Sequence, residues 1–440
     1  MTNPAAGAAV PSLPDRGPAL VRAIGRWDLT ASVVNAVVGS AIFGLPATIA
    51  ALTGAWSPLA VLLAGLGILP IVLCFAEVGS RFDAAGGPYL YAREAFGSAT
   101  GFHVGWLLLW TRLLSGAAVL NVMVTYLAQL APWAGTAGGR ATVMTAAVAL
   151  VTAINVLGVR QAAWTVNLFT VAKLLPLLLV IALGLLALDR GVLATQAVAT
   201  PRWTDAVLLL VFAYGGFESA VIAASETRRP RHDTAFALVA AMVMITAIYA
   251  LVQLAVVGSL PQAGTSPAPI ADALRARLGA AGTVLGSAAA VVSTYGWLTG
   301  FALLMPRVPY SMAERGELPA LFGRVHARFR TPWISVIACS AAALALALAG
   351  TFAATATLSA ISRLVVYGIT CAALLVLRRR VTAPAAGFTL PAGPLFAAAG
   401  IVFALWLLST RSLAQGWLLA AIVLAGVVVW LAMRRRPTTA

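Results

Sequence analysis

The sequence has very few charged residues and contains only one lysine and three histidines. Charged residues make up 10% of the 440 positions and hydrophobic residues 61%, whereas soluble domains carry about 25% charged residues. The mean hydropathy is +0.95. This composition excludes an ordinary soluble globular protein.

Residues that hold metals or form disulfides are also scarce. The three cysteines lie inside apolar runs, which indicates neither a disulfide framework nor a zinc site. The three histidines lie near or beyond the ends of these runs, so a membrane enzyme would lack clustered titratable side chains. We therefore expect no metal, no cofactor and no enzymatic activity; the residues concerned are Cys74, Cys339, Cys371, His103, His232 and His326.

Two further motifs are missing. No GxxxxGK[ST] phosphate-binding loop occurs, so this chain is not expected to hydrolyse ATP. The first 20 residues lack the features of a secretory signal and are interpreted as the start of a short cytoplasmic tail.

The net charge of +16 comes from short arginine clusters between apolar runs, not from a basic stripe with interleaved aromatic residues. Nucleic acid is therefore not an expected partner, and the clusters are typical of topology signals. With a cytoplasmic N-terminus, 20 of the 29 basic residues fall on the cytoplasmic side and six outside. The distribution predicts that both termini lie in the cytoplasm.

Many apolar runs reach the ~20 residues that a helix needs to cross a bilayer. They predict an all-α integral membrane protein with twelve transmembrane helices, over residues 29–52, 58–80, 102–130, 141–159, 163–188, 205–225, 234–258, 281–304, 333–350, 353–377, 392–410 and 413–433.

The first apolar run contains the stretch VVGSAIFGLP, in which Gly39, Ser40 and Ala41 follow one another. A membrane helix can be interrupted only where its backbone lines a protein cavity, and the amides of its second half then favour an anion. The alternative is that these small residues only allow a neighbouring helix to pack closely.

The sixth run contains a second candidate interruption, VFAYGGFESA, with adjacent Gly215 and Gly216. Each glycine weakens a helix by about 1 kcal/mol relative to alanine. Interruptions in corresponding spans of two halves indicate the binding site of a transporter. A receptor or channel would not need this matched pair.

The only lysine, Lys173, lies about eleven residues from either end of the fifth apolar run. A buried ammonium can lose its proton near neutral pH, which an arginine cannot, so Lys173 is a candidate for proton coupling. The alternative is a snorkelling or ion-paired structural lysine. Arg112 and Arg363 also lie within spans, as gates or ion-pair partners.

Two polar loops on the predicted cytoplasmic side are interpreted as scaffold and gate supports. In the first, Glu77 and Arg81 have the spacing of a helical ion pair. The second runs from Leu304 to Pro332.

Several of these stretches occur together, and in the same order, in one known family. GSAIF resembles the first-span GSGIF signature of the amino acid–polyamine–organocation (APC) superfamily, with Ala41 in place of a glycine. AEVGSRFDAAGGPYLYAREAFG, KLLP, FAYGGFESAVIAASETRRP and YSMAERGELP are similar to further motifs of that family, although Thr227 and Arg228 depart from the usual basic-Asn pair. The resemblance extends from about residue 25 to 410.

The resemblance implies a LeuT-type fold of two inverted repeats, at 29–188 and 205–377, followed by two helices at 392–433. Residues 1–28 and 434–440 would be cytoplasmic tails. The substrate's α-carboxylate would meet the amides at the first break, and its ammonium the carbonyls at the second. Ala41 restricts how closely the substrate approaches the backbone. The candidate binding residues are Val38, Gly39, Ser40, Ala41, Ile42, Phe212, Ala213, Tyr214, Gly215 and Phe217.

Tyr214 and Phe217 are candidates for the wall or lid of the pocket, with Phe301 and Glu218 as further possibilities. The alternative is that Phe212, Tyr214 and Phe217 are packing residues. The pocket is predicted to suit a neutral or modestly sized side chain better than a strongly basic one. The same resemblance suggests that Lys173 replaces a sodium ion between the fifth and first spans.

The sequence as a whole predicts a secondary active transporter of amino acids or related amines in the cytoplasmic membrane, coupled to protons. The alternatives are an exchanger of substrate and product, or a polyamine or organic-amine permease. The expected partners are the small-molecule substrate, protons and the lipid bilayer.

Overall fold

The computed structural model describes residues 25–82, 86–157, 163–186, 188–218 and 230–434, with the side chains of 163–173 and 230–232 left out. Within these residues the chain forms helices and no strands. Seven helical segments are long and apolar enough to cross a membrane. The prediction of an all-helical, multi-pass membrane protein is therefore confirmed for this part of the chain.

Each of the twelve predicted apolar ranges contains a helix, and the first contains two. These helices are α1 (Arg26–Val37), α2 (Ala41–Thr53), α3 (Ser57–Gly79), α5 (Ser98–Leu130), α6 (Ala137–Val156), α7 (Ala163–Leu186), α9 (Trp203–Ala213), α11 (Pro230–Ser259), α13 (Ala280–Leu304), α15 (Trp333–Ala349), α16 (Phe352–Arg379), α17 (Gly393–Ser409) and α18 (Leu413–Arg434).

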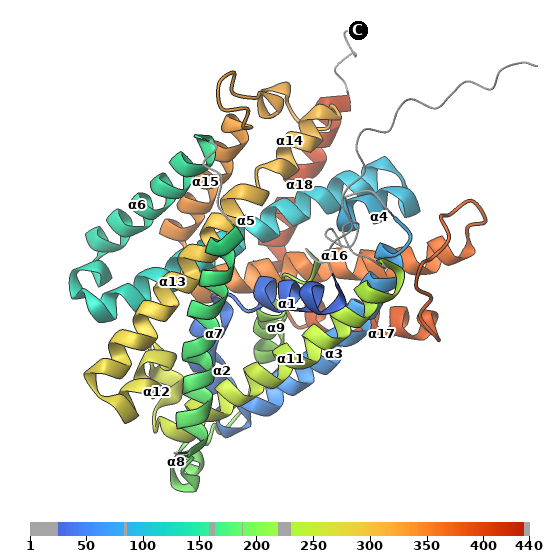
Figure 1. Cartoon of the computed structure of the whole chain (residues 1–440). Coiled ribbons are helices and arrows are strands. Elements are labelled where there is room, and N and C mark those ends of the chain that lie inside the picture. Colours follow the sequence, from blue (N-terminus) through green and yellow to red (C-terminus); the bar gives the residue numbers. More distant parts are fainter. Residues whose placement is uncertain (1–24, 83–85, 158–162, 187, 219–229, 435–440) are drawn as a thin grey trace, which may run out of the picture.

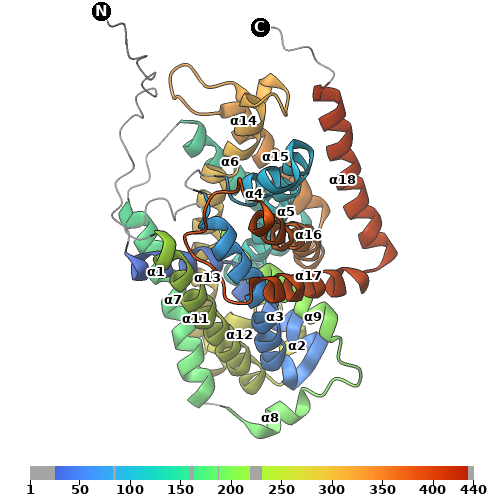
Figure 2. The ribbon, with the colours of Figure 1, turned by 90° about the vertical axis from the view of Figure 1, so that its right-hand side faces the viewer.

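Shorter helices lie between the long ones. They are η1 (Gly54–Trp56), α4 (Gly87–Phe96), η2 (Pro132–Gly135), α8 (Arg190–Thr195), η4 (Ala263–Thr265), α12 (Pro269–Leu278), α14 (Arg307–Glu314) and η5 (Ala320–Gly323). Helix α14 lies at the same end of the molecule as the C-terminal end of α18, and α8 and α12 lie at the opposite end (Figures 1 and 2). Loops that follow successive membrane crossings must lie alternately at the two ends of the molecule.

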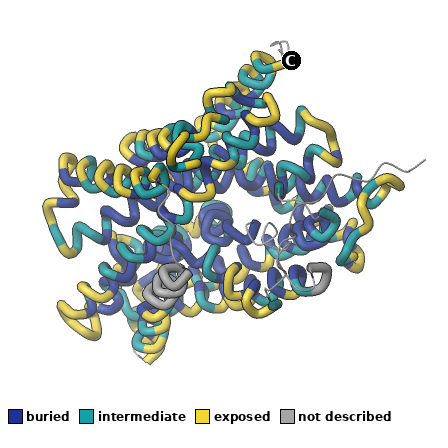
Figure 3. Tube along the Cα trace, turned by 45° about the horizontal axis from the view of Figure 1, so that its top comes forward, coloured by how far each residue is buried: buried dark blue, intermediate teal, exposed yellow. Residues whose placement is uncertain are grey.

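Large apolar side chains cover much of the outside of the helices. Leu66, Leu395 and Trp417 are 67%, 70% and 73% exposed. Exposed positions lie along the outer faces and buried positions in the interior (Figure 3). Such an apolar exterior would be a liability in water and is expected where helices face lipid.

The interior carries hydrogen-bonded polar groups between helices. The Ser359 hydroxyl of α16 donates to the Thr111 carbonyl oxygen of α5 at 2.9 Å, and the Ser115 and Ser359 hydroxyl oxygens lie 2.9 Å apart. Small hydroxyl residues allow close helix packing and satisfy each other in a medium without water. They join α5 and α16.

The predicted ion pair Glu77–Arg81 is confirmed, with 3.1 Å between Glu77 Oε1 and Arg81 Nη2. The fully buried Glu77 carboxylate also accepts from Arg378 at the end of α16, at 2.5 Å, and from the Leu390 amide at 2.9 Å. One carboxylate therefore joins α3, α16 and the segment before α17.

The two polar loops meet at the α14 end of the molecule. The Tyr89 hydroxyl of α4 donates to Glu317 at 2.9 Å, and Arg93 of α4 lies 3.3 Å from the same carboxylate. This contact joins the loop after α3 to the loop after α14.

Candidate functional site at two helix breaks

The first predicted interruption is present. Helix α1 ends at Val37 and α2 begins at Ala41, with Val38, Gly39 and Ser40 in non-helical turns between them. All three residues between the helices are buried. The break therefore lies inside the protein, where an exposed backbone needs partners.

The amides at the start of α2 are available to a ligand. The amides of Phe43 and Gly44 bond to the Ser40 carbonyl oxygen, each at 3.1 Å. The four preceding amides, of residues 39–42, donate to no acceptor in the part of the chain that the structure describes. Such a first turn, with its positive dipole end, is suited to an anion.

The second predicted interruption is also present. Helix α9 ends at Ala213, residues 214–217 form turns, and the chain is helical again at Glu218. Residues 219–229, which complete the predicted span, lie outside the described residues. Gly216 has φ +123°, a backbone conformation that favours glycine.

The two breaks face each other directly. A Cβ atom built on Gly216 would lie 2.7 Å from the Ala36 carbonyl oxygen and 3.3 Å from Val37 Cα. Any side chain at this position would therefore collide with the end of α1. The two interruptions, far apart in the sequence, therefore lie against each other.

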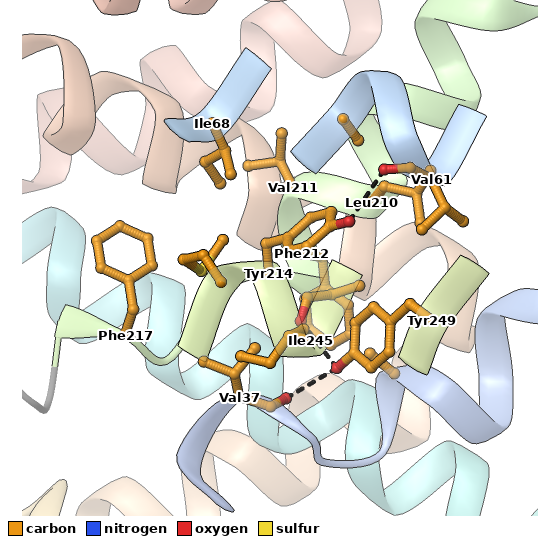
Figure 4. Packing of buried hydrophobic residues seen from close by; sticks show 14 of the residues in the cluster. Val37, Val61, Ile68, Leu210, Val211, Phe212, Tyr214, Phe217, Ile245 and Tyr249 are labelled. Carbon is orange, nitrogen blue, oxygen red and sulfur yellow. Dashed lines mark hydrogen bonds between the residues drawn. The ribbon is translucent and has the colours of Figure 1, made fainter. Parts of the chain in front are cut away.

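Tyr249 of α11 joins both broken ends. Its hydroxyl oxygen lies 3.1 Å from the Val37 carbonyl oxygen at the end of α1 and 3.3 Å from the Ala213 carbonyl oxygen at the end of α9 (Figure 4). The sequence analysis did not identify this residue, because a tyrosine in an apolar run carries no local sign of its hydrogen-bond partners.

The aromatic candidates of the second break are packed against other helices. The Tyr214 side chain is fully buried, and its hydroxyl donates to the Val61 carbonyl oxygen of α3 at 2.9 Å (Figure 4). The Phe217 ring packs against Phe75 and Tyr367, with ring centroids 5.2 and 5.3 Å away. These contacts are those of packing residues.

The Phe212 ring lies at a different place, edge-on to Phe352 of α16 with ring centroids 6.2 Å apart. Phe352 in turn contacts Gly44 of α2. Phe212 thus lies beside the helix whose first turn carries the available amides.

Glu218 forms a buried network with α16. One oxygen of its carboxylate accepts from Arg363 Nη1 at 2.5 Å and from the Tyr367 hydroxyl at 2.9 Å. The other oxygen accepts from the Gly216 amide at 2.6 Å. The Arg363 guanidinium lies against Gly215, where a Cβ would collide with it. The structure thus gives Arg363 the role of ion-pair partner.

Trp297 of α13 covers the first break. Its Cδ1 atom would lie 3.2 Å from a Cβ built on Gly39. The indole stacks on Phe301, with ring centroids 5.4 Å apart and an interplanar angle of 15°. The sequence indicates Phe301 as a candidate for the site but not Trp297. Its position over Gly39 follows from how α13 packs, which no local pattern encodes.

Lys173 belongs to α7, but its side chain lies outside the described part of the chain. Helix α7 itself packs against α11, α12 and α13. Among the described residues no group of three or more His, Cys, Asp or Glu side chains could hold a metal ion. The three cysteines are buried and form no disulfide.

The sequence matches known transporters over nearly its whole length. A family model described as "Amino acid permease" matches residues 24–432. The chain is 28% identical to the serine/threonine exchanger SteT of Bacillus subtilis, over 95% of this chain and 98% of the relative. It is 26% identical to the methylthioribose transporter of Bacillus subtilis, over 96% and 94%. It is 28% identical to the human Asc-type amino acid transporter 1, over 82% and 72%.

Proposed function

Because the chain belongs to the amino acid permease family, we propose that it is a secondary transporter of amino acids that works by alternating access. Its twelve predicted spans would form a LeuT-type arrangement: inverted repeats at 29–188 and 205–377, followed by two helices at 392–433. The arginine distribution supports placing it in the cytoplasmic membrane with both termini in the cytoplasm.

The observation that carries this proposal is the meeting of the two helix breaks. The available amides of residues 39–42 suit the substrate's α-carboxylate. The carbonyl groups at the ends of α1 and α9 suit its ammonium group, because helix C-terminal ends favour cations. One zwitterion would then hold both halves of the transporter together, which gives it a differential affinity for the closed state.

The electrostatics of the second break argue against a cationic side chain on the substrate. Among the described residues Glu218 is the carboxylate near the breaks, and Arg363 already neutralises it at 2.5 Å. A substrate that carries a second ammonium or a guanidinium would have to displace Arg363. The proposed substrates are therefore amino acids without a basic side chain.

Proton coupling through Lys173 remains part of the proposal. Deprotonation of this lysine would weaken a bridge between the fifth span and the broken first span, and so link proton movement to the opening of the site. Exchange of one amino acid for another is the second candidate function, since the matched relative SteT is named as an exchanger.

Uptake of labelled amino acids into proteoliposomes tests these proposals. An inward proton gradient should stimulate uptake by the wild-type protein, and this stimulation should be lost in Lys173→Ala. The control is Lys173→Arg, which keeps a permanent charge and should still bind substrate without responding to pH. Sodium dependence, or an unchanged pH response in Lys173→Ala, would reject the coupling proposal.

Two other results would decide the mode of transport. Uptake that requires amino acid preloaded in the vesicles, with no effect of the proton gradient, would identify an exchanger. The absence of uptake or exchange of any amino acid or amine would reject the proposed function itself.

A further inference from the structure

A cavity of about 390 Å³ lies at the α14 end of the molecule. Its walls are the ends of α6 and α13, helix α14, the segment 325–332 and the start of α15 (Figure 1). Among the described residues, those that line it belong to none of the broken helices α1, α2 and α9. The cavity is therefore separate from the proposed substrate site.

The charged groups that line the cavity are two guanidinium groups, of Arg307 and Arg330, and the carboxylate of Glu314. The carboxylate accepts from the Tyr310 hydroxyl on the same helix at 2.5 Å. Within the described residues, the side chains of Arg307 and Arg330 make no hydrogen bond or ion pair. One positive charge is thus in excess, and the cavity is complementary to a single anion.

The wall that carries Arg330 is held in place by hydrogen bonds. The Thr331 hydroxyl donates to the Val156 carbonyl oxygen at the end of α6, and the His326 amide donates to the Thr331 carbonyl oxygen, each at 2.8 Å. Arg330 itself has φ +56°, a left-handed conformation that is unfavourable for a residue with a side chain. Because such strain is concentrated at functional sites, and glycine would avoid it, an arginine here indicates a use for its guanidinium group.

The cavity lies where membrane-spanning segments end. Helices α6 and α13 belong to segments that are long and apolar enough to cross a membrane, and Leu303, near the end of α13, lines the cavity and is 45% exposed. Further along α6, α13 and α15 a small apolar pocket shares Ala302 with the cavity. A cationic cavity that continues into apolar surface fits a molecule with an anionic head and an apolar tail.

We propose that this cavity binds the headgroup of an anionic phospholipid, with Arg307 and Arg330 as the ligands of its phosphate. The phosphodiester supplies one negative charge, and guanidinium groups match phosphate oxygens in geometry. The acyl chains lie against Leu303 and the apolar surface beyond Ala302. The arginine distribution places this end of the molecule in the cytoplasm, where basic pockets between membrane helices are typical sites for lipid headgroups. This inference does not depend on which substrate is transported.

Thermal unfolding of the purified protein in detergent tests this site, with phosphatidylglycerol, phosphatidylethanolamine or phosphatidylcholine added at equal mole fractions. Phosphatidylglycerol should raise the Tm more than the two zwitterionic lipids do. Arg307→Gln and Arg330→Gln should each weaken the apparent affinity for phosphatidylglycerol about five- to tenfold, because each removes one charged contact. The double variant should respond equally to all three lipids. Arg324→Gln, an exposed arginine of the same segment that does not line the cavity, is the matched control and should behave as the wild type.

Arg330→Gly separates lipid binding from folding. It removes the guanidinium group and relieves the left-handed conformation, so without lipid it should unfold at or above the wild-type Tm, while its affinity for phosphatidylglycerol falls as in Arg330→Gln. A lower Tm without lipid would assign Arg330 to the fold and count against the proposal.

Other results would overturn the proposal directly. One is an equal response of the wild-type protein to the three phospholipids, and another is an unchanged response to phosphatidylglycerol in the double variant. Inorganic phosphate and glycerol 3-phosphate serve as soluble probes of the same chemistry. If they stabilise the wild-type protein as strongly as phosphatidylglycerol does, the cavity is a site for a free phosphate and not for a lipid.

Discussion

The two helix breaks differ in the partners of their backbone amides, which have lost their places in a regular helix. At the first break, between α1 and α2, the amides of residues 39–42 have no acceptor in the described residues. At the second break, Glu218 accepts from the Gly216 amide and is itself paired with Arg363 of α16. The first break thus leaves backbone amides available to a ligand, whereas at the second break the Glu218 side chain already accepts from the Gly216 amide.

This difference suggests that the two breaks have different functions. The first break would bind the substrate's carboxylate, and the second would connect the site to α16 through a buried ion pair. Tyr249 touches the carbonyl ends of both breaks and couples them. The four predictions below test this comparison, from the largest expected effect to the smallest.

Gly39→Leu should abolish substrate binding while the protein still folds. Even a Cβ at this position would lie 3.2 Å from Trp297, so a leucine side chain must displace the indole or occupy the space between it and the first break. The measurement is stabilisation of the purified protein by amino acids in thermal unfolding, where ligand at 100 Kd adds about 2.7 kcal/mol. Gly416→Leu, at an exposed position with open space around it, is the matched control. Retained binding in Gly39→Leu would place the site elsewhere.

Glu218→Gln should destabilise the protein by about 3–5 kcal/mol, because it leaves the Arg363 charge buried without its partner. Arg363→Gln should have a similar effect, because it leaves the Glu218 carboxylate buried without its cation. The double variant removes both charges and should recover most of the loss, which thermal unfolding in detergent can measure. A double variant as unstable as the sum of the two single changes would show that the two groups are not coupled.

Alanine substitutions at Gly215 and Gly216 distinguish two contacts of the second break, with Arg363 and with the end of α1. Gly216→Ala should cost about 1–3 kcal/mol, because its φ of +123° is strained for alanine and the new Cβ meets the Ala36 backbone. Gly215→Ala meets the Arg363 guanidinium, which can move. Its effect should therefore shrink when combined with Arg363→Gln and Glu218→Gln, whereas the effect of Gly216→Ala should not. Equal behaviour of both glycines in that background would contradict the assignment.

Tyr249→Phe should cost about 1 kcal/mol of stability, the usual net contribution of a hydrogen bond, and raise the KM for uptake several-fold because both broken ends lose their shared donor. Tyr214→Phe is the matched control. It removes a buried hydroxyl that donates to the Val61 carbonyl oxygen of α3 and not to the end of α1 or α9. It should lower stability by a similar amount, with KM changed by less than about twofold. Similar KM values for both variants would mean that Tyr249 does not couple the breaks.

Local patterns predicted the helices well. The range 333–350 corresponds to Trp333–Ala349 and the range 281–304 to Ala280–Leu304. A run of about 20 apolar residues must cross a bilayer as a helix, since no other local structure satisfies its backbone there. The i, i+4 pair of Glu77 with Arg81 was predictable for the same reason: both partners lie on one helix.

Partners from distant segments could not be predicted. Glu77 also binds Arg378, which is 301 positions away, and Glu218 binds Arg363, which is 145 positions away. The sequence showed Arg363 as a basic residue within a span, without a partner. Trp297 and Tyr249 looked like ordinary residues of apolar helices until the packing of α13 and α11 brought them to the breaks.

The sequence by itself determined where the chain becomes helical and where two helices stop, because hydropathy, small residues and adjacent glycines act within one or two turns. The tertiary structure decided which partners the backbone and charged groups at each interruption have. Only the packing of α5, α11, α13 and α16 around the breaks leaves the amides of residues 39–42 available and neutralises Glu218. The physical reason is that a buried polar group takes whichever partner packing brings within hydrogen-bond distance, and that choice depends on the whole arrangement of helices.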